Sequence, residues 1–269
     1  MSVYTKFYTL QAMVKAIVHD VSSDMTAHPA EHALILEPNF AWQVENNDQQ
    51  HHLTVDLTRP FDINSLIWIH REDEAVSPSP YGMFADVYYS NDDVTYTKAT
   101  LDVDPGINAK LLKVAEFSVT GNYRYWKISI RGTDYPSYYA PDDMRISAVW
   151  WAKKHELSAG SNFTLDDKTI VPGKSYDGAY GEKLTVGFGV NERKSFDRVY
   201  VLDDTDYATL LSVLAECDGG STPVVLQELT DDPIIVKINK MVSTKFAIGW
   251  QSVNMSFETV PMVARDEYY

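Results

Sequence analysis

The sequence predicts a mainly β protein, with a β-sandwich or barrel in its first half and a β-rich α+β domain with one helix in its second. Three observations predict this fold. Short segments of alternating apolar and polar residues recur in the first half, with turn residues between them. The chain holds 17 Tyr, 10 Phe and 6 Trp, an aromatic supply typical of sheets. One amphipathic helical pattern stands out, at residues 204–217.

The first half supplies most of the expected strands. In the segment 123–132, Tyr125 and Lys127 fall on one face, and Trp126 and Ile128 fall on the other. Two helical pieces are expected before the strands, around 9–19 and 29–36. The expected strands are 53–57, 65–70, 84–90, 94–99, 110–119, 123–132 and 145–153.

A domain boundary is expected near residue 153, where a strong strand gives way to a polar segment. This predicts two domains, 1–152 and 153–269. The Gly-, Pro- and Tyr-rich segment 169–183 is typical of a β-hairpin with an exposed loop. In the expected helix, Tyr207, Leu210, Leu211 and Leu214 follow helical spacing, and Asp218-Gly219-Gly220 ends it. Further strands are expected in 181–204, 222–229, 233–242 and 245–261.

Charge and hydropathy narrow the classes of partner. The formal net charge of −15 repels phosphate backbones and anionic membranes, so neither a nucleic acid nor a membrane is expected as a partner. The first twenty residues lack the pattern of a signal peptide, and no window reaches the ~18 apolar residues of a membrane span. We therefore expect a protein made in a cytoplasm without a cleavable signal.

One short motif, HPAEH at residues 28–32, matches the H-x-x-E-H pattern of an inverted zinc peptidase. In such a site both histidines lie on one helical turn. Pro29 fits only the first position of a helix, which leaves His28 outside the turn, and Glu37-Pro38 keeps the helix short. A helix that begins with a proline is the favoured interpretation, with the zinc enzyme as the alternative.

Other constellations predict no catalytic residue, no metal site and no cofactor. The acidic pairs at 102–104 and 203–204 could bind a structural calcium ion, although roles in turns and helix caps explain these residues better. His51-His52 point to opposite faces of a strand and are poor ligands for one metal. Cys217 fits a packed helix position. A carboxylate pair for glycoside hydrolysis has no local spacing and stays open.

Tyrosine-bearing loops are the remaining candidates for binding. Tyr135, Tyr138 and Tyr139 lie in a loop bounded by prolines, and Tyr81 lies in a second Pro-Tyr-Gly loop. A tyrosine offers an apolar ring with a polar tip, which suits a sugar ring or a protein interface. These four residues are the predicted ligand- or partner-binding residues, and packing against the domain's own edge is the alternative.

Residues 42–150 resemble the discoidin, or F5/8 type C, family of galactose-binding-like sandwiches. The resemblance implies an eight-stranded jelly-roll β-sandwich that binds glycans or other partners with loops at one end, and it carries over no ligand. The family's opening cysteine is missing. The resemblance rests on Trp42, Asp56-Leu57, Pro60, Ile63-Asn64, Ser90, Asp92, Tyr96 and Arg124-Tyr125-Trp126 in this order.

Residues 180–260 resemble bacteriophage tail and virion structural proteins more loosely. This second resemblance implies an assembly surface, and it rests on Arg198-Val199-Tyr200-Val201, Tyr207 to Leu214, Thr222-Pro223-Val224-Val225, Trp250, Val253 and Ser256-Phe257-Glu258.

The two resemblances together predict a non-enzymatic virion component of a bacteriophage. Its partners would be other virion proteins and further copies of itself, and its sandwich would bind a neighbouring subunit or a host-surface glycan. The alternative is a glycan-binding accessory module of a bacterial carbohydrate-active system. A zinc or hydrolytic enzyme is the third hypothesis.

Overall fold

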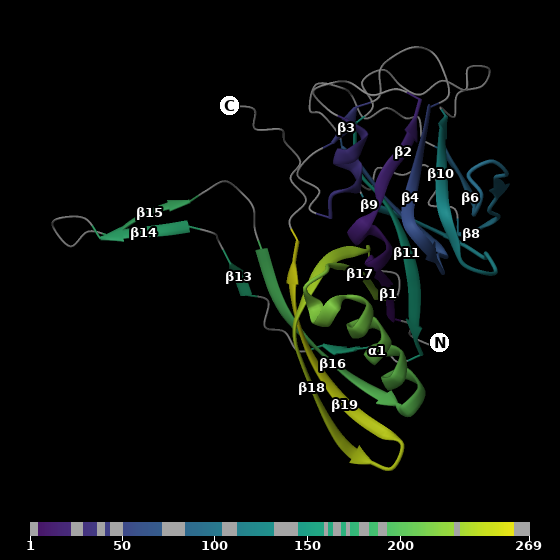
Figure 1. The fold of residues 1–269 in the computed structure, drawn as a ribbon. Helices are drawn as coiled ribbons and strands as arrows, with labels where there is room; N and C mark the ends of the chain where they lie inside the picture. Colours follow the sequence, from purple (N-terminus) through teal and green to yellow (C-terminus); the bar gives the residue numbers. More distant parts are fainter. Residues whose placement is uncertain are drawn as a thin grey trace. The chain divides into compact units, whose positions relative to one another are not determined.

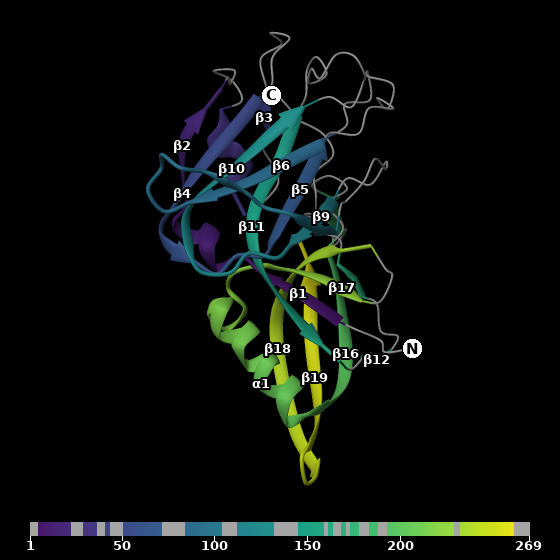
Figure 2. The same ribbon diagram turned by 90° about the vertical axis from the view of Figure 1, so that its right-hand side faces the viewer.

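The computed structural model shows two compact units (Figures 1 and 2), here called the sandwich unit (Tyr8–Lys154) and the C-terminal unit (Met1–Phe7 and His155–Val263). In the part of the chain that the structure describes, the fold is mainly β with a single α-helix, as the sequence predicts. The structure describes residues 5–22, 29–36, 41–43, 51–71, 84–103, 112–131, 145–158, 161–163, 168–170, 173–177, 183–187, 193–228 and 232–260.

The sandwich unit is built from two antiparallel sheets. The first, called here the outer sheet, has the order β2-β4-β10-β6-β7, with bounds Ile17–Val21, His51–Phe61, Tyr123–Arg131, Phe84–Ser90 and Thr97–Lys98. In the second sheet the order is β11-β5-β9-β8, with bounds Arg145–Leu157, Ser65–Arg71, Leu112–Phe117 and Leu101–Val103, and β3 (Trp42–Gln43) also pairs with β11.

Alternation along the strands creates the core of this unit. In β4, Leu53, Val55 and Leu57 are buried, as the sequence pattern predicts. Trp126 of β10 is completely buried, and its ring centroid lies 5.6 Å from that of Phe117 on β9. Apolar side chains from both sheets therefore meet in one layer, which is the packing of a β-sandwich.

Both helical pieces expected near the N-terminus are confirmed in part. Gln11–Lys15 and Ala30–Leu34 each form a 3₁₀ helix of five residues, and the rest of the first piece continues as strand β2. The backbone of Ile17 and Val18 instead pairs with Asp56 and Val55 on β4, so tertiary pairing overrides the local pattern.

The C-terminal unit holds an antiparallel sheet whose order is β12-β16-β19-β18-β17-β1. Strand β13 also pairs with β16, and β14–β15 forms a separate hairpin overlapping the one expected at 169–183. The bounds are Thr5–Thr9 for β1, Ser161–Phe163 for β12, Lys168–Ile170 for β13, Gly173–Asp177 for β14, Lys183–Gly187 for β15, Arg193–Asp203 for β16, Val224–Glu228 for β17, Ile234–Ala247 for β18 and Trp250–Thr259 for β19.

Helix α1 (Asp204–Glu216) covers one face of this sheet (Figure 2), as the spacing at 204–217 predicts. Asp203 caps it by accepting a hydrogen bond from the amide of Asp206 at 2.8 Å. Leu210 and Val213 are buried against Val253 and other apolar residues of the sheet. No helix in the described part of the chain is long and apolar enough to cross a bilayer.

Close packing after α1 requires a glycine. A 3₁₀ turn, Asp218–Gly220, follows the helix, and Gly220 has φ +99. A Cβ atom on Gly220 would lie 2.0 Å from the carbonyl oxygen of Ile238 on β18, whereas a Cβ on Gly219 would meet nothing within 4 Å. Only a glycine at 220 allows the turn to rest against β18.

Candidate functional site on the outer sheet

The outer sheet has one face on the sandwich core and one face turned away from it. Tyr125, Lys127 and Ser129 alternate along β10 with the buried Trp126 and Ile128, so they lie on the outward face, as the sequence predicts. Lys127 pairs with Tyr88 of β6. Side chains that face each other across antiparallel strands have Cβ atoms about 5 Å apart, so this face gathers polar groups from several strands.

A β-bulge places Arg124 on the same face. The register between β10 and β4 shifts between Tyr123 and Tyr125, so Arg124 does not follow the strict alternation. Its guanidinium donates two hydrogen bonds to the carboxylate of Asp56, each 2.7 Å long. The bond from Arg124 is the main reason that the pKa of Asp56 is lowered. Two residues of the family resemblance therefore form an ion pair that ties β4 to β10.

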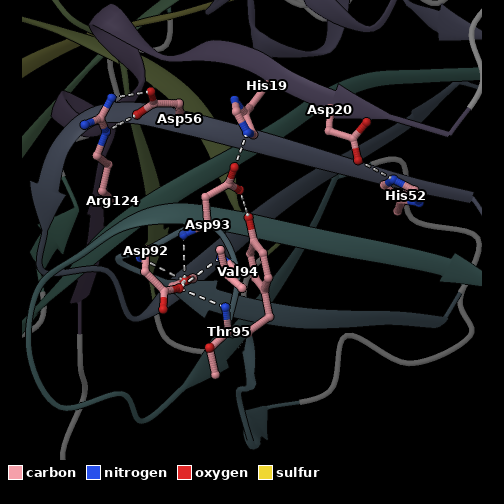
Figure 3. A network of polar contacts seen from close by, with 11 residues as sticks. His19, Asp20, His52, Asp56, Asp92, Asp93, Val94, Thr95 and Arg124 are labelled. Carbon is pink, nitrogen blue, oxygen red and sulfur yellow. Dashed lines mark hydrogen bonds and ion pairs between the residues drawn. The ribbon is translucent and has the colours of Figure 1, made fainter.

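The turn between β6 and β7 is organised by Asp92. Its Oδ1 atom accepts hydrogen bonds from the amides of Thr95 at 2.8 Å and Val94 at 3.0 Å, and from the hydroxyl of Ser90 at 2.8 Å (Figure 3). These bonds to the charged form, that of Thr95 first, lower the pKa of Asp92 to about 2. Ser90 and Asp92, expected from the resemblance, thus act in the turn.

A second chain of contacts connects this turn to the edge strand β2. Asp93 accepts a hydrogen bond from the hydroxyl of Tyr96 at 2.6 Å and contacts Nε2 of His19 at 2.5 Å (Figure 3). The bond from Tyr96 is the main reason that the pKa of Asp93 is lowered. The His19 ring lies 5.3 Å from the ring of Tyr125. These contacts hold β2, β10 and the β6–β7 turn in one arrangement.

Four partly buried residues remain on this face as a surface that we call the tyrosine–lysine face: Tyr88, Tyr96, Tyr125 and Lys127. The ammonium of Lys127 lies 5.9 Å from the ring centroid of Tyr96. Within the described part of the chain, the hydroxyls of Tyr88 and Tyr125 and the ammonium of Lys127 make no hydrogen bond. The face therefore offers polar groups that a ligand can satisfy, between aromatic rings held on paired strands.

Ion pairs border the tyrosine–lysine face on two sides. Lys98 contacts Asp86 at 2.7 Å, and His52 contacts Asp20 at 2.9 Å (Figure 3). His51 is buried, and desolvation is the main reason that its pKa is lowered. The neighbouring histidines thus point to opposite sides of β4, as strand alternation predicts.

The other expected chemical groups have structural contacts. In the HPAEH segment, His32 contacts the carbonyl oxygen of Ala41 through Nδ1 at 3.2 Å, and His28 lies outside the described residues. Cys217 is buried, its thiol donates to the carbonyl of Val213, and burial raises its pKa to about 11. Among the described residues, no three His, Cys, Asp or Glu side chains group closely enough to hold a metal ion.

The residues predicted for binding from the loop sequences all lie outside the described residues, so that prediction stays a prediction. They are Tyr81, Tyr135, Tyr138 and Tyr139. The sequence separated Tyr125 and Lys127 from the core, but it did not single them out. Their pairing with Tyr88 and the approach of Tyr96 depend on strand order and on a turn, which the alternation does not contain.

The sandwich is similar to family 32 carbohydrate-binding modules in solved structures. The module of NanJ from Clostridium perfringens, in complex with galactose, is 16% identical, with a TM-score of 0.40 over 55% of this chain and 99% of that chain. A second C. perfringens module, CpGH89CBM32-5 in complex with GalNAc-β-1,3-galactose, is 14% identical, with a TM-score of 0.40 over 54% and 98%. The EndoD module of Streptococcus pneumoniae is 16% identical, with a TM-score of 0.39 over 51% and 94%. No protein family and no curated protein matches the chain.

Proposed function

We propose that this chain is a non-catalytic glycan-binding protein and that its sandwich unit binds a saccharide on the tyrosine–lysine face. One observation carries the proposal: Lys127, Tyr88 and Tyr125 present polar groups without hydrogen bonds to described residues, on neighbouring paired strands. A sugar carries hydroxyls around a ring that also has apolar C–H groups. Aromatic side chains with polar tips match both features.

Rigidity supports this assignment. The ion pair of Arg124 with Asp56, together with the bonds to Asp92 and Asp93, holds the strands and the β6–β7 turn around the face. A site that is ordered before binding loses less conformational entropy when the ligand arrives. A small, polar and weakly held ligand such as a saccharide benefits from that saving.

This proposal corresponds to the alternative hypothesis of a glycan-binding module. The bacteriophage virion role stays a prediction, because neither the contacts described above nor the similar structures support it. The proposal that the chain is non-catalytic is supported by the contacts of the carboxylates and the thiol described above, which hold these groups in structural interactions. Asp56, Asp92 and Asp93 are held by Arg124, by turn amides and by Tyr96, and the Cys217 thiol is buried in its protonated form.

The test is a calorimetric titration of the full chain with saccharides, which measures the binding affinity. Galactose and GalNAc-β-1,3-galactose, named for the similar modules, are the first probes, followed by a glycan array. Lys127→Met keeps the length of the side chain and removes its charge, and Tyr88→Phe and Tyr125→Phe remove only hydroxyls. Each lost hydrogen bond is expected to weaken binding about 5- to 10-fold. Lys15→Met, an exposed lysine of the same unit, is the matched control.

A second arm separates the face from the predicted loops. The triple variant Tyr135→Ala, Tyr138→Ala, Tyr139→Ala, with and without Tyr81→Ala, is expected to bind as the unchanged chain does. If the loop variants lose binding while the variants of the tyrosine–lysine face keep it, the glycan-binding function stands but the tyrosine–lysine face is not the binding site. No binding to any saccharide on the array would reject the function itself.

A further inference from the structure

The β18–β19 hairpin of the C-terminal unit exposes a cluster of large apolar side chains. Figures 1 and 2 both show its turn projecting past α1. Large exposed apolar residues scattered singly are ordinary, but a contiguous group marks an interaction site. Four lie within nine residues of this hairpin: Ile248 (95% exposed), Phe246 (59%), Val242 (48%) and Trp250 (46%).

The same hairpin is basic, although the chain as a whole is acidic. Residues 234–259 contain three lysines, Lys237, Lys240 and Lys245, and one acidic residue, Glu258, opposite Lys237, whereas the whole chain carries a net charge of −15. Its charge therefore complements an acidic surface. Anionic lipid is a poor candidate for that surface, because the field of the rest of the chain repels it.

Contact through the open edge of β18 is disfavoured. Within the described residues, β17 pairs with β18 only at Ile234–Val236, which leaves the remainder of that edge without a strand. The edge carries the three lysines, and bulges interrupt the register at Ile238/Lys240 and Lys245/Ala247. Lysines and bulges are devices by which natural proteins prevent pairing between sheet edges. The apolar side chains of the tip are therefore the binding element.

Helix α1 presents a surface of matching character. Residues 203–218 contain no Lys or Arg, and two of their five acidic residues, Asp204 and Asp218, are exposed. The other three have contacts within the unit, since one is buried, one caps the helix and one pairs with His155. Ala208, Leu211, Ser212 and Ala215 follow spacing i, i+3, i+4 and i+7 on the exposed side of the helix, and Leu211 is 44% exposed. Small side chains beside an exposed leucine allow a close approach by large ones.

A hairpin cannot reach this surface on its own chain. The opposite side of α1 packs on the sheet through Leu210 and Val213, and Tyr207 contacts Ser243 of the same hairpin at 3.1 Å. We infer that a second copy of this chain supplies the partner: Phe246, Ile248 and Trp250 of one copy pack against the exposed face of α1 of the next. The exposed Lys240 and Lys245 of the hairpin then approach the exposed Asp204 and Asp218 at the ends of that helix.

Such a contact is heterologous, because two different surfaces meet. It leaves a free hairpin at one end and a free helix at the other, so it produces open chains or closed rings of copies. The inference is independent of the proposed glycan binding.

The test uses two variants of the full chain that each disable one surface. The hairpin variant is Phe246→Asp with Ile248→Asp, and the helix variant is Leu211→Arg with Ala215→Arg. Sedimentation velocity is expected to show concentration-dependent association of the unchanged chain, reduced at high salt, and monomers for each variant alone. Mixed at equal amounts, the two variants retain one functional interface, so they are expected to form a dimer that grows no further.

Val94→Asp is the control, since Val94 is 83% exposed in the sandwich unit, and it is expected to associate as the unchanged chain does. Circular dichroism confirms that each variant is folded. A monomeric unchanged chain at high concentration and low salt, or a variant mixture without dimers, would overturn the inference. Binding of the monomer to phosphatidylcholine–phosphatidylserine vesicles, lost in the hairpin variant, would overturn it in favour of a lipid partner.

Discussion

The outer sheet of the sandwich unit and the β18–β19 hairpin are both antiparallel strands with a face in water, yet their surfaces differ in chemistry. On the outer sheet, ion pairs and turn bonds satisfy most polar groups and leave a few between tyrosine rings. On the hairpin, large apolar side chains and lysines stand exposed. The comparison teaches that strand pairing determines the scaffold, whereas the residues on the outward positions determine whether a small polar ligand or a protein surface fits.

The largest expected loss of stability comes from a change in the core beneath the outer sheet. Trp126→Ala removes a completely buried ring that contacts Phe117 and Tyr89, and it is expected to cost about 3–5 kcal/mol of unfolding free energy. Tyr125→Ala, its neighbour on the outward face, is expected to cost far less. Chemical denaturation measures both, and equal losses would contradict the assignment of the two faces of β10.

In the C-terminal unit, the corresponding test is a single added methyl group. Gly220→Ala forces a Cβ atom to within 2.0 Å of the Ile238 carbonyl oxygen at a positive φ, so about 2–4 kcal/mol of destabilisation is expected. Gly219→Ala has positive φ but open space, and it is expected to cost about 1 kcal/mol. Thermal unfolding of the two variants gives the difference, and a milder effect at 220 would show that the turn can move away from β18.

Lowering the pH is expected to have an intermediate effect on the unfolding free energy, through the carboxylates of the outer sheet. The folded-state pKa values of Asp56, Asp92 and Asp93 lie below the ordinary value of 3.8, so the unfolded chain binds more protons. Their contribution to stability is complete above the unfolded pKa and is lost as the pH falls from about 4 towards 2. Denaturation across that range is expected to show a shallower pH dependence for Asp92→Asn. An unchanged slope would contradict the role of the turn bonds.

The smallest effects on stability belong to the two proposed binding surfaces. Ile248 is 95% exposed, and Lys127 is only partly buried and makes no hydrogen bond to a described residue, so Ile248→Asp and Lys127→Met are each expected to change the unfolding free energy by less than about 0.5 kcal/mol. Each is nevertheless expected to weaken one association and leave the other intact. Measuring saccharide titration and sedimentation for both variants tests this separation directly.

The sequence predicted the fold better than the site. Alternation identified the strands around Leu53 and Trp126, and helical spacing with an Asp cap identified α1, because these signals are local. The helical piece expected at 9–19 is helical only over Gln11–Lys15, because pairing with β4 makes Ile17–Val21 a strand. Arg124 shows the limit most clearly, because strict alternation would place it beside Trp126 and Ile128, whereas a bulge places it against Asp56. The tyrosine–lysine face joins residues from β6, β10 and a turn, and no local pattern encodes that meeting.

The most direct test of the central claim is a two-dimensional amide NMR titration of the full chain with the saccharide that binds most tightly. The proposed face predicts that the largest shifts belong to Tyr88, Tyr96, Tyr125 and Lys127, and that Lys127→Met raises the saccharide concentration at their midpoint by about 5- to 10-fold. Shifts confined to residues 72–83 and 132–144, with those four amides unmoved, would contradict it.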